Sequence, residues 1–161
     1  MIEIRKATEP DFDSIWMIFK QVVAAGDTYV FSLDTSKREA RGHWMSDSVH
    51  TYVACEENAI LGTYIIRQNQ PGLGSHVANA AFMVDPAAQG RGIGRLLGEH
   101  AIAQARDLGF EAMQFNFVVS TNTGAIALWE KLGFQIVGRL PKAFRHKQLG
   151  LVDAYVMHRF L

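Results

Sequence analysis

The sequence has no excess of charge of either sign. It carries 16 lysine and arginine residues and 16 aspartate and glutamate residues in a chain of 161 residues. Proteins that bind nucleic acid or an anionic membrane usually present a basic surface, and this balance provides no such electrostatic attraction. We therefore expect neither nucleic acid nor a membrane surface as a partner.

Cysteine and long apolar runs are also scarce. Cys55 is the only cysteine, so no disulfide can form within the chain, and its place in the strand-like run TYVACE indicates a buried thiol rather than a nucleophile. The sequence has no run of about 18 apolar residues, the length of a transmembrane helix, and no signal-peptide core. We therefore expect a cytoplasmic protein.

The hydrophobic pattern predicts one mixed α/β domain over residues 1–161. Alternating or continuous apolar runs predict strands at residues 2–7, 51–57, 59–68, 76–84, 111–119, 134–140 and 150–160. Apolar residues three and four apart predict helices near residues 12–23, 36–47, 93–108 and 120–133. Thr8 and Asp11 have the spacing of a capping box before the first helix.

Glycines occupy alternate positions in QGRGIGRLL, residues 89–97, directly before a helix-like stretch. Glycine inside a helix costs about 1 kcal/mol relative to alanine, so Gly90, Gly92 and Gly94 need a reason. One reason is a tight turn without any ligand. The other is access, because bare N–H groups at the positive end of a helix suit a phosphate.

Two well-known phosphate motifs do not fit this stretch. A P-loop requires Lys followed by Ser or Thr, but Arg95 and Leu96 follow Gly94. A dinucleotide fingerprint requires G-x-G-x-x-G, and Arg95 or Leu97 stands where its third glycine would be. The pattern that remains is Q-x-x-G-x-G, from Gln89 to Gly94, between a strand and a helix.

This pattern resembles the central motif of the GNAT acyl-CoA N-acyltransferase superfamily. FMVDPAAQGRGIGRLL is similar to the strand, glycine loop and helix of that motif, and TNTGAIALWEKLGFQIVGRLP is similar to the second motif of the superfamily. The two motifs occur in the same order and at the same separation as in the superfamily. The resemblance implies a strongly twisted mixed sheet of about seven strands, flanked by about four helices and splayed where CoA binds.

Further segments resemble a subgroup that acetylates small cyclic imino acids such as azetidine-2-carboxylate and hydroxyproline. They are AGDTYVF, NQPGLGSHVANAAFMV, QFNFVVSTN and GRLPKAFRHKQLGLVDAYVM. The chain is more distantly similar to acetyltransferases of phosphinothricin and methionine-derivative type. The resemblance therefore implies acetyl-CoA as co-substrate, a small amino or imino acid as acceptor, and no metal.

The resemblance also implies which residues bind CoA. Met83 and Val84 would offer backbone groups to the pantetheine arm, with the Val84 N–H facing the thioester oxygen. The pyrophosphate would lie on the backbone from Gln89 to Arg95, and Arg91 and Arg95 would add charge there or simply be solvated. The residues of this set are Met83, Val84, Gln89, Gly90, Arg91, Gly92, Ile93, Gly94, Arg95, Asn122 and Trp129.

Three asparagines are the candidates for the chemistry of transfer. Asn116 lies between two phenylalanines of a predicted strand, where asparagine is disfavoured and needs a hydrogen-bond partner. Asn122 precedes a helix and suits an N-cap, while the resemblance implies a contact with the pantetheine near the sulfur. For Asn79, the subgroup implies a role in positioning the acceptor.

One position departs from the superfamily. Many members carry a tyrosine four residues before the glycine of L-G-F, where its hydroxyl can protonate the departing thiolate, and this chain has Trp129. An indole N–H is not a general acid, so Asn122 or water must stabilise the thiolate. The general base is open between His76, His146 on a predicted cleft-side loop, and a water chain, which we favour.

The acceptor side is expected in the loop that follows the first helix. Thr28, Tyr29 and Phe31 of GDTYVF would contact the acceptor, although helix packing also fits them. The function we expect is direct acetyl transfer to a small amine, in a protein that the resemblance suggests is a homodimer. Two alternatives are a CoA-binding sensor or interaction module with degenerate catalysis, which Trp129 favours, and a peptide or protein N-acetyltransferase.

Overall fold

The computed structural model describes residues 1–161 and contains one seven-stranded sheet. The strands are β1 (Ile2–Lys6), β2 (His50–Glu56), β3 (Ala59–Gln68), β4 (Val77–Val84), β5 (Ala112–Val119), β6 (Gln135–His146) and β7 (Gly150–Phe160). The helices are α1 (Phe12–Ala25), α2 (Lys37–Trp44), α3 (Ile93–Asp107) and α4 (Thr123–Lys131), with short 3-10 turns at Glu9–Asp11, Gly72–Gly74 and Pro86–Ala88. The predicted α/β fold is confirmed.

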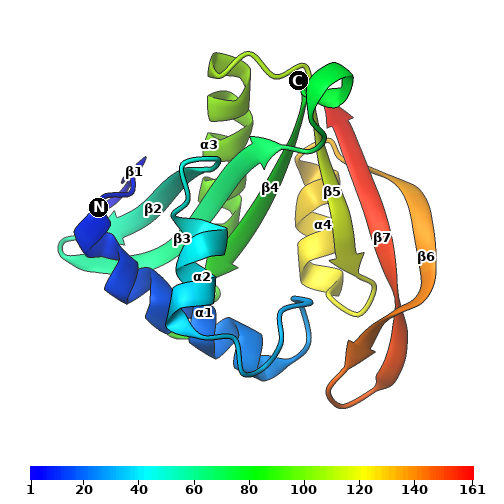
Figure 1. Ribbon diagram of the computed structural model, residues 1–161, viewed down its shortest axis with the longest axis horizontal. Helices are drawn as coiled ribbons and strands as arrows, with labels where there is room; N and C mark the ends of the chain where they lie inside the picture. Colours follow the sequence, from blue (N-terminus) through cyan, green and yellow to red (C-terminus); the bar gives the residue numbers. More distant parts are fainter.

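Helices cover both faces of the sheet, α1 and α2 on one and α3 and α4 on the other (Figure 1), and a hydrophobic cluster lies beneath each pair. Phe19 of α1 and Trp44 of α2 pack on Ile65 and Met83 of the sheet. Residues of α3 and α4 pack on the opposite face, where Tyr64 of β3 is fully buried. Successive side chains of a strand point to opposite faces, which is why neighbouring residues of β3 belong to different layers.

The sheet divides between β4 and β5. Its order is β1-β2-β3-β4-β5-β7-β6, and β4 and β5 form the only parallel pair. They pair only from Val77 and Ala112 to Asn79 and Gln114, then diverge toward the lower part of Figure 1. The predicted splay is therefore present, and we call its starting point at Asn79 the fork.

Beyond the fork, β4 has a free edge. In an antiparallel pair, only every second residue of a strand exchanges backbone hydrogen bonds with its partner strand. Asp85 N donates to Leu61 O at 2.8 Å, so the odd-numbered residues at this end of β4 are the ones bonded to β3. The backbone groups of Met83 consequently point toward β3. Those of Phe82 and Val84 point toward the space that β5 leaves open.

Asp11 ties β1 to the start of α1. Its carboxylate accepts hydrogen bonds from both terminal nitrogens of Arg5, at 2.7 and 2.9 Å, and from the backbone N of Thr8 at 2.7 Å. The side chain is nearly buried, and the hydrogen bonds with Arg5 lower the pKa of Asp11 to about 2. The predicted capping box between Thr8 and Asp11 is present.

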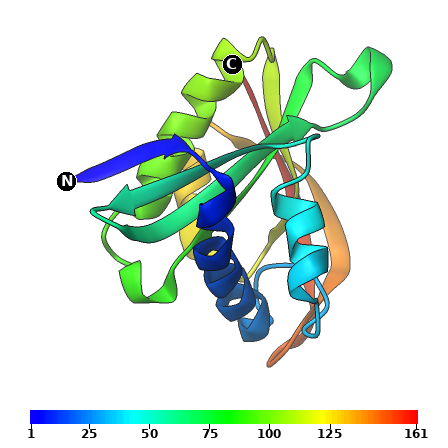
Figure 2. The ribbon, with the colours of Figure 1, turned by 60° about the vertical axis from the view of Figure 1, so that its left-hand side comes forward.

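The strand predicted to end at Leu140 continues to His146. β6 keeps pairing with β7 across two register shifts, and the second of these covers the residues between Leu140 and Phe144. The hairpin tip reaches α1, where Lys147 N donates to Gly26 O at 3.0 Å (Figure 2). None of the helices combines the length and the apolar character that crossing a bilayer requires.

Candidate functional site

The glycine-rich loop presents a row of unused backbone donors. Gly90 and Gly92 have φ angles of 79° and 77°, a left-handed conformation that favours glycine, and Gly92 is the N-cap of α3. The first bond of the helix runs from Leu96 N to Gly92 O, so the N–H groups from Gly90 to Arg95 donate to no group of the protein. With the positive end of the helix dipole, these N–H groups are suited to binding an anion.

Gly94 shows why this backbone is bare. It lies inside α3, and an added Cβ would meet only Leu128 Cδ2, at 3.5 Å, an ordinary contact. Neither the turn nor the packing requires glycine there. A bare backbone at this position leaves room for the approach of a ligand. Ile93 can offer only its backbone, because its side chain is 1% exposed.

The two arginines of the loop are held by carboxylates. Arg91 donates to Glu56 at 2.7 Å, and Arg95 donates to Glu99 at 2.7 Å. Both guanidinium groups remain partly exposed, so their other N–H groups are available beside the anion site. The hydrogen bond from Arg91 lowers the pKa of the Glu56 carboxyl.

Tyr29 reaches the free edge of β4 from the loop after α1. Its hydroxyl donates to the carbonyl of Phe82 and accepts from the Phe82 N–H, at 2.9 Å for the second bond. Burial raises the pKa of the Tyr29 hydroxyl, so the phenol is neutral at ordinary pH. Val84 keeps its N–H and carbonyl free for a ligand, while Met83 uses its own within the sheet.

Thr28 is the neighbour of Tyr29 and carries an unsatisfied group. Its Oγ1 is the only buried side-chain nitrogen or oxygen in the protein without a hydrogen-bond partner. Such a group costs free energy unless water or a ligand satisfies it. Phe31 of the same loop packs on Tyr29, Phe19 and His43, which matches the packing alternative for this residue.

Asn122 and Trp129 belong to α4 and its N-cap, on the other side of the opening between β4 and β5. Asn122 is the N-cap of α4, as predicted, and its Oδ1 accepts from Ala125 N at 3.4 Å, while its Nδ2 donates to no group of the protein. Trp129 is buried between Phe82 of β4 and Phe115 of β5, with ring centroids 4.7 Å from each. α4 approaches α3 closely at Gly98, where a Cβ would come within 3.0 Å of the Trp129 ring.

Asn79 and Asn116 belong to one network of polar side chains. Asn79 is 8% exposed and lies at the fork, where its Nδ2 donates to the carbonyl of Gln114 at 3.0 Å. Asn116 is exposed in a bulge of β5, and its Nδ2 donates to Asn69 Oδ1 at 2.7 Å. The partner expected for Asn116 is therefore found.

Sequence reasoning missed three members of this network, which are Arg67, Asn69 and Gln114. Arg67 Nε donates to Asn79 Oδ1 at 3.4 Å, and Gln114 Nε2 donates to Asn116 Oδ1 at 2.9 Å. Residues two apart on a strand share a face. The polar pairs 67 with 69 and 114 with 116 were therefore the signal in the sequence that could have indicated a polar cluster on one face.

Neither histidine candidate lies at the free edge of β4. His76 is exposed just before β4, and eight residues of strand, about 26 Å, separate it from Val84. His146 ends β6 instead of lying on a loop, and its Nδ1 accepts from the N–H groups of Gln148 and Leu149 at 3.1 and 3.2 Å. His146 thus stabilises a hairpin turn.

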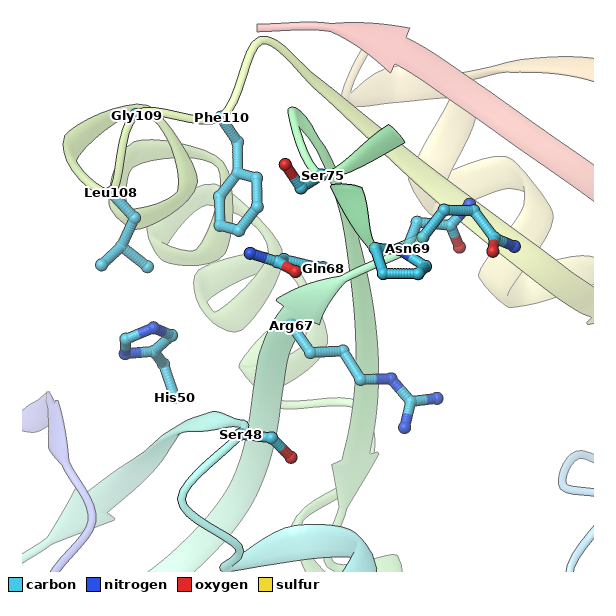
Figure 3. A pocket seen from close by; sticks show the side chains of 11 residues that line it. Ser48, His50, Arg67, Gln68, Asn69, Ser75, Leu108, Gly109 and Phe110 are labelled. Atoms are coloured by element: carbon cyan, nitrogen blue, oxygen red, sulfur yellow. The ribbon is translucent and has the colours of Figure 1, made fainter. Parts of the chain in front are cut away.

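A polar cavity of about 600 Å³ lies at the opposite end of β4 from the glycine loop (Figure 3). Its walls include Ser48, His50, Gln68, Ser75 and Phe110. It also borders the polar network through two shared residues, Arg67 and Asn69. No three or more histidine, cysteine, aspartate or glutamate side chains come together in a way that could hold a metal ion.

Several known proteins share this fold. A GCN5-related N-acetyltransferase from Kribbella flavida is 43% identical, with a TM-score of 0.96, and the match covers 99% of this chain and 98% of that one. A phosphinothricin acetyltransferase from Sinorhizobium meliloti in complex with AcCoA has the same fold, at 23% identity and a TM-score of 0.88, with coverage of 99% and 88%.

The N-acetyltransferase aca1 of Schizosaccharomyces pombe is 40% identical over 101 residues. That match covers 62% of this chain, and the chain spans 48% of the length of aca1. The acetyltransferase (GNAT) family, taken as a sequence model, matches residues 13–134, a range that includes α1, the fork, the glycine loop and α4. The chain therefore belongs to the acetyltransferase (GNAT) family.

Proposed function

We propose that this protein transfers the acetyl group of acetyl-CoA to the amine of a small metabolite, an amino or imino acid, by direct transfer in a ternary complex. The observation that carries the proposal is the row of free N–H groups from Gly90 to Arg95, next to the free edge of β4. A diphosphate attached to an amide-containing arm is the chemistry that complements both features. The AcCoA complex of the Sinorhizobium enzyme supports the same choice.

Each part of CoA has a matching feature of the chain. The pyrophosphate is bound by the N–H groups of the glycine loop, where Gly94 permits close approach. The pantetheine arm follows the free edge of β4 at Val84, much as an added strand would. The Val84 N–H then donates to the thioester oxygen and stabilises the negative charge that develops there during attack.

The leaving thiolate and the attacking amine lie on different sides of the thioester. Asn122 Nδ2, which has no partner in the protein, stabilises the thiolate, and Trp129 forms a wall beside the arm. The amine enters from the side of Thr28 and Tyr29, and a chain of water molecules removes its proton. Cys55 is buried with its thiol directed at Glu3 O, 3.6 Å away, so it is not the nucleophile of a covalent mechanism.

A peptide or protein N-terminus is the second candidate acceptor. The N-alpha-acetyltransferase RimI of Mycobacterium tuberculosis is 40% identical over 76 residues, which favours this candidate. Tyr29 and the hairpin tip at Lys147 close the acceptor side at α1, which favours a small acceptor over a chain.

The experiment is an acceptor screen that follows free thiol released from acetyl-CoA. The panel contains amino acids, imino acids, short peptides and mycothiol-like amino sugars, with Gly94→Val as the control for CoA binding. Thiol release that saturates with a small amino or imino acid supports the proposal. Release with peptides alone assigns the second candidate. Binding of CoA with no release for any amine would leave a CoA-binding module with degenerate catalysis.

A homodimer is a separate proposal. The β6–β7 hairpin exposes apolar side chains that a second copy would cover, among them Val137 at 60%, Leu149 at 63% and Leu151 at 48% exposure. Light scattering of the eluted protein at micromolar concentration measures its mass directly. A monomer's mass of 17.9 kDa at every concentration contradicts the dimer.

A further inference from the structure

The polar network at the fork ends in a guanidinium group with unused donors. Arg67 gives only its Nε–H to Asn79, so both terminal nitrogens donate to no group of the protein. Five other arginines form ion pairs with carboxylates, and Arg67 is not among them. The network therefore presents a cation without a counter-charge.

The Arg67 guanidinium lies on the face of the sheet that α1 and α2 cover, the side from which the proposed acceptor enters. Arg67 lies two residues after Ile65, which faces α1 and α2, and it is paired across the strands with Asn79. In Figure 3 its guanidinium points away from His50 and Phe110, and so away from the center of the cavity at that end of the sheet.

The amide network fixes where this charge lies. Asn79 is held by Gln114 O, so its Oδ1 stays oriented toward Arg67 Nε. Gln114 and Asn116 continue the network on the same face, where they donate to Asn116 Oδ1 and Asn69 Oδ1. Asn79 is three residues, about 10 Å along the strand, from Phe82, where Tyr29 marks the acceptor entry.

We propose that Arg67 binds the carboxylate of the acceptor and that Asn79 positions it for this task. The inference rests on the proposed function, since it assigns the acceptor class at that same site. A guanidinium presents two parallel N–H groups that match the two oxygens of a carboxylate. Arg67 thus selects α-amino and imino acids over amines that lack the carboxylate.

In this proposal Asn79 orients Arg67 and does not itself contact the acceptor. Replacing Asn79 by aspartate would pair Arg67 internally and cancel its charge, while leucine would release it. Both variants should therefore weaken the binding of acids and leave the binding of acetyl-CoA unchanged.

The kinetic test compares two acids, L-azetidine-2-carboxylate and L-methionine, with their primary carboxamides. The variants are Arg67→Gln and Arg67→Lys, with Arg106→Gln as the matched control, because Arg106 is an exposed, unpaired arginine on α3 at the other face. We expect Arg67→Gln to raise KM for the acids about ten- to a hundredfold, the range for a lost charged hydrogen bond, with kcat and KM for acetyl-CoA unchanged. Lysine restores only part of the binding, because it keeps the charge without the fork.

A binding measurement separates this inference from the proposed function. Ligand-observed NMR of the same two acids is recorded on the protein saturated with CoA, where no transfer can occur. Acid binding that Arg67→Gln removes and Arg106→Gln retains supports the inference, even if no thiol is released. Equal binding of acid and carboxamide, unchanged binding in Arg67→Gln, or no acid binding at all overturns the inference, while thiol release in the screen still decides the transferase.

Discussion

At Gly94 neither packing nor a turn requires glycine, and the proposed pyrophosphate site would explain it. We expect Gly94→Val to lower the affinity for CoA at least tenfold, because the side chain would stand between the N–H groups and the pyrophosphate. Stability should change by only a few tenths of a kcal/mol, since both residues are poor helix formers and an added Cβ makes only an ordinary contact with Leu128. Calorimetric titration with CoA and a thermal melt measure the two effects.

The matched control is Gly42→Val in α2, where an added Cβ meets nothing within 4 Å. The control should bind CoA as the wild type does. Equal CoA affinity in a folded Gly94→Val protein would contradict the placement of the pyrophosphate on this loop.

Asn122 combines a cap with an unused donor, and one substitution separates the two roles. Asn122→Asp keeps the cap, so the melting temperature should hold. Turnover should fall by about two orders of magnitude, because the variant loses the Nδ2 donor and adds a negative charge beside the thiolate. Full transfer by this stable variant would reduce Asn122 to a helix cap.

Residues whose chemistry is local could be predicted from the sequence. The glycine turn, the Asn122 cap and the need of Asn116 for a partner all follow from neighbours in the chain, and the structure contains each of them. Arg67 could not be predicted as a site residue, because arginine is common near strand ends and the sequence does not show which residues of other strands lie beside it. Its role depends on Asn79, twelve residues away and on another strand.

At the scale of elements, the Arg5–Asp11 pair joins β1 to α1 and makes stability depend on pH. The pKa of Asp11 falls from 3.8 to about 2 in the folded protein, so the pair stabilises fully above pH 4 and loses its effect as pH falls through 2. Asp11→Asn should lower the free energy of unfolding by about 1–2 kcal/mol at pH 7, allowing for partial screening at Arg5. Urea unfolding at pH 7 and pH 2.5 measures the difference.

The control for this prediction is Asp13→Asn, which removes an exposed pair with Lys37. It should cost less than about 0.5 kcal/mol at either pH. A loss in Asp11→Asn that is the same at both pH values would show that the carboxylate's charge does not matter.

Element boundaries followed the pattern except where the sheet is irregular. The strand predicted over residues 134–140 stops just before Pro141, and proline inside a sheet is confined to edges, strand starts and bulges. The observed β6 passes this proline through a register shift, in which Lys142 adopts a φ of 49° and its N–H donates to Asp153 at 2.9 Å. A bulge of this kind depends on a partner strand and leaves no periodic signal in the sequence.

At the scale of the molecule, the hairpin tip joins the C-terminal half to α1 at Gly26. Gly26 has a φ of 65°, and an added Cβ would lie 2.8 Å from Lys147 Cβ. Gly26→Ala should therefore cost about 1–2 kcal/mol and shift the loop that carries Tyr29. We expect KM for the acceptor to rise more than KM for acetyl-CoA in steady-state kinetics.

Gly109→Ala is the matched control, since Gly109 has a φ of 87° and open space around it. It carries the same backbone strain without the contact, so it should lower stability and leave both KM values unchanged. An equal rise of the acceptor KM in both variants would assign the effect to general destabilisation. The contact of Tyr29 with Phe82, like that of Gly26 with Lys147, joins distant segments and lay beyond prediction from one sequence.

In the proposed complex, the pantetheine arm of CoA takes the place of a strand beside the free edge of β4. An exposed edge strand can pair with another chain, but Tyr29 already bonds the backbone of Phe82 and Trp129 packs on its ring, which leaves only a short length of edge at Val84. A ligand at a hundred times its Kd adds about 2.7 kcal/mol to the free energy of unfolding. Acetyl-CoA and CoA carry the same arm, so either ligand would stabilise the fold to the extent that it is bound, whether or not transfer occurs.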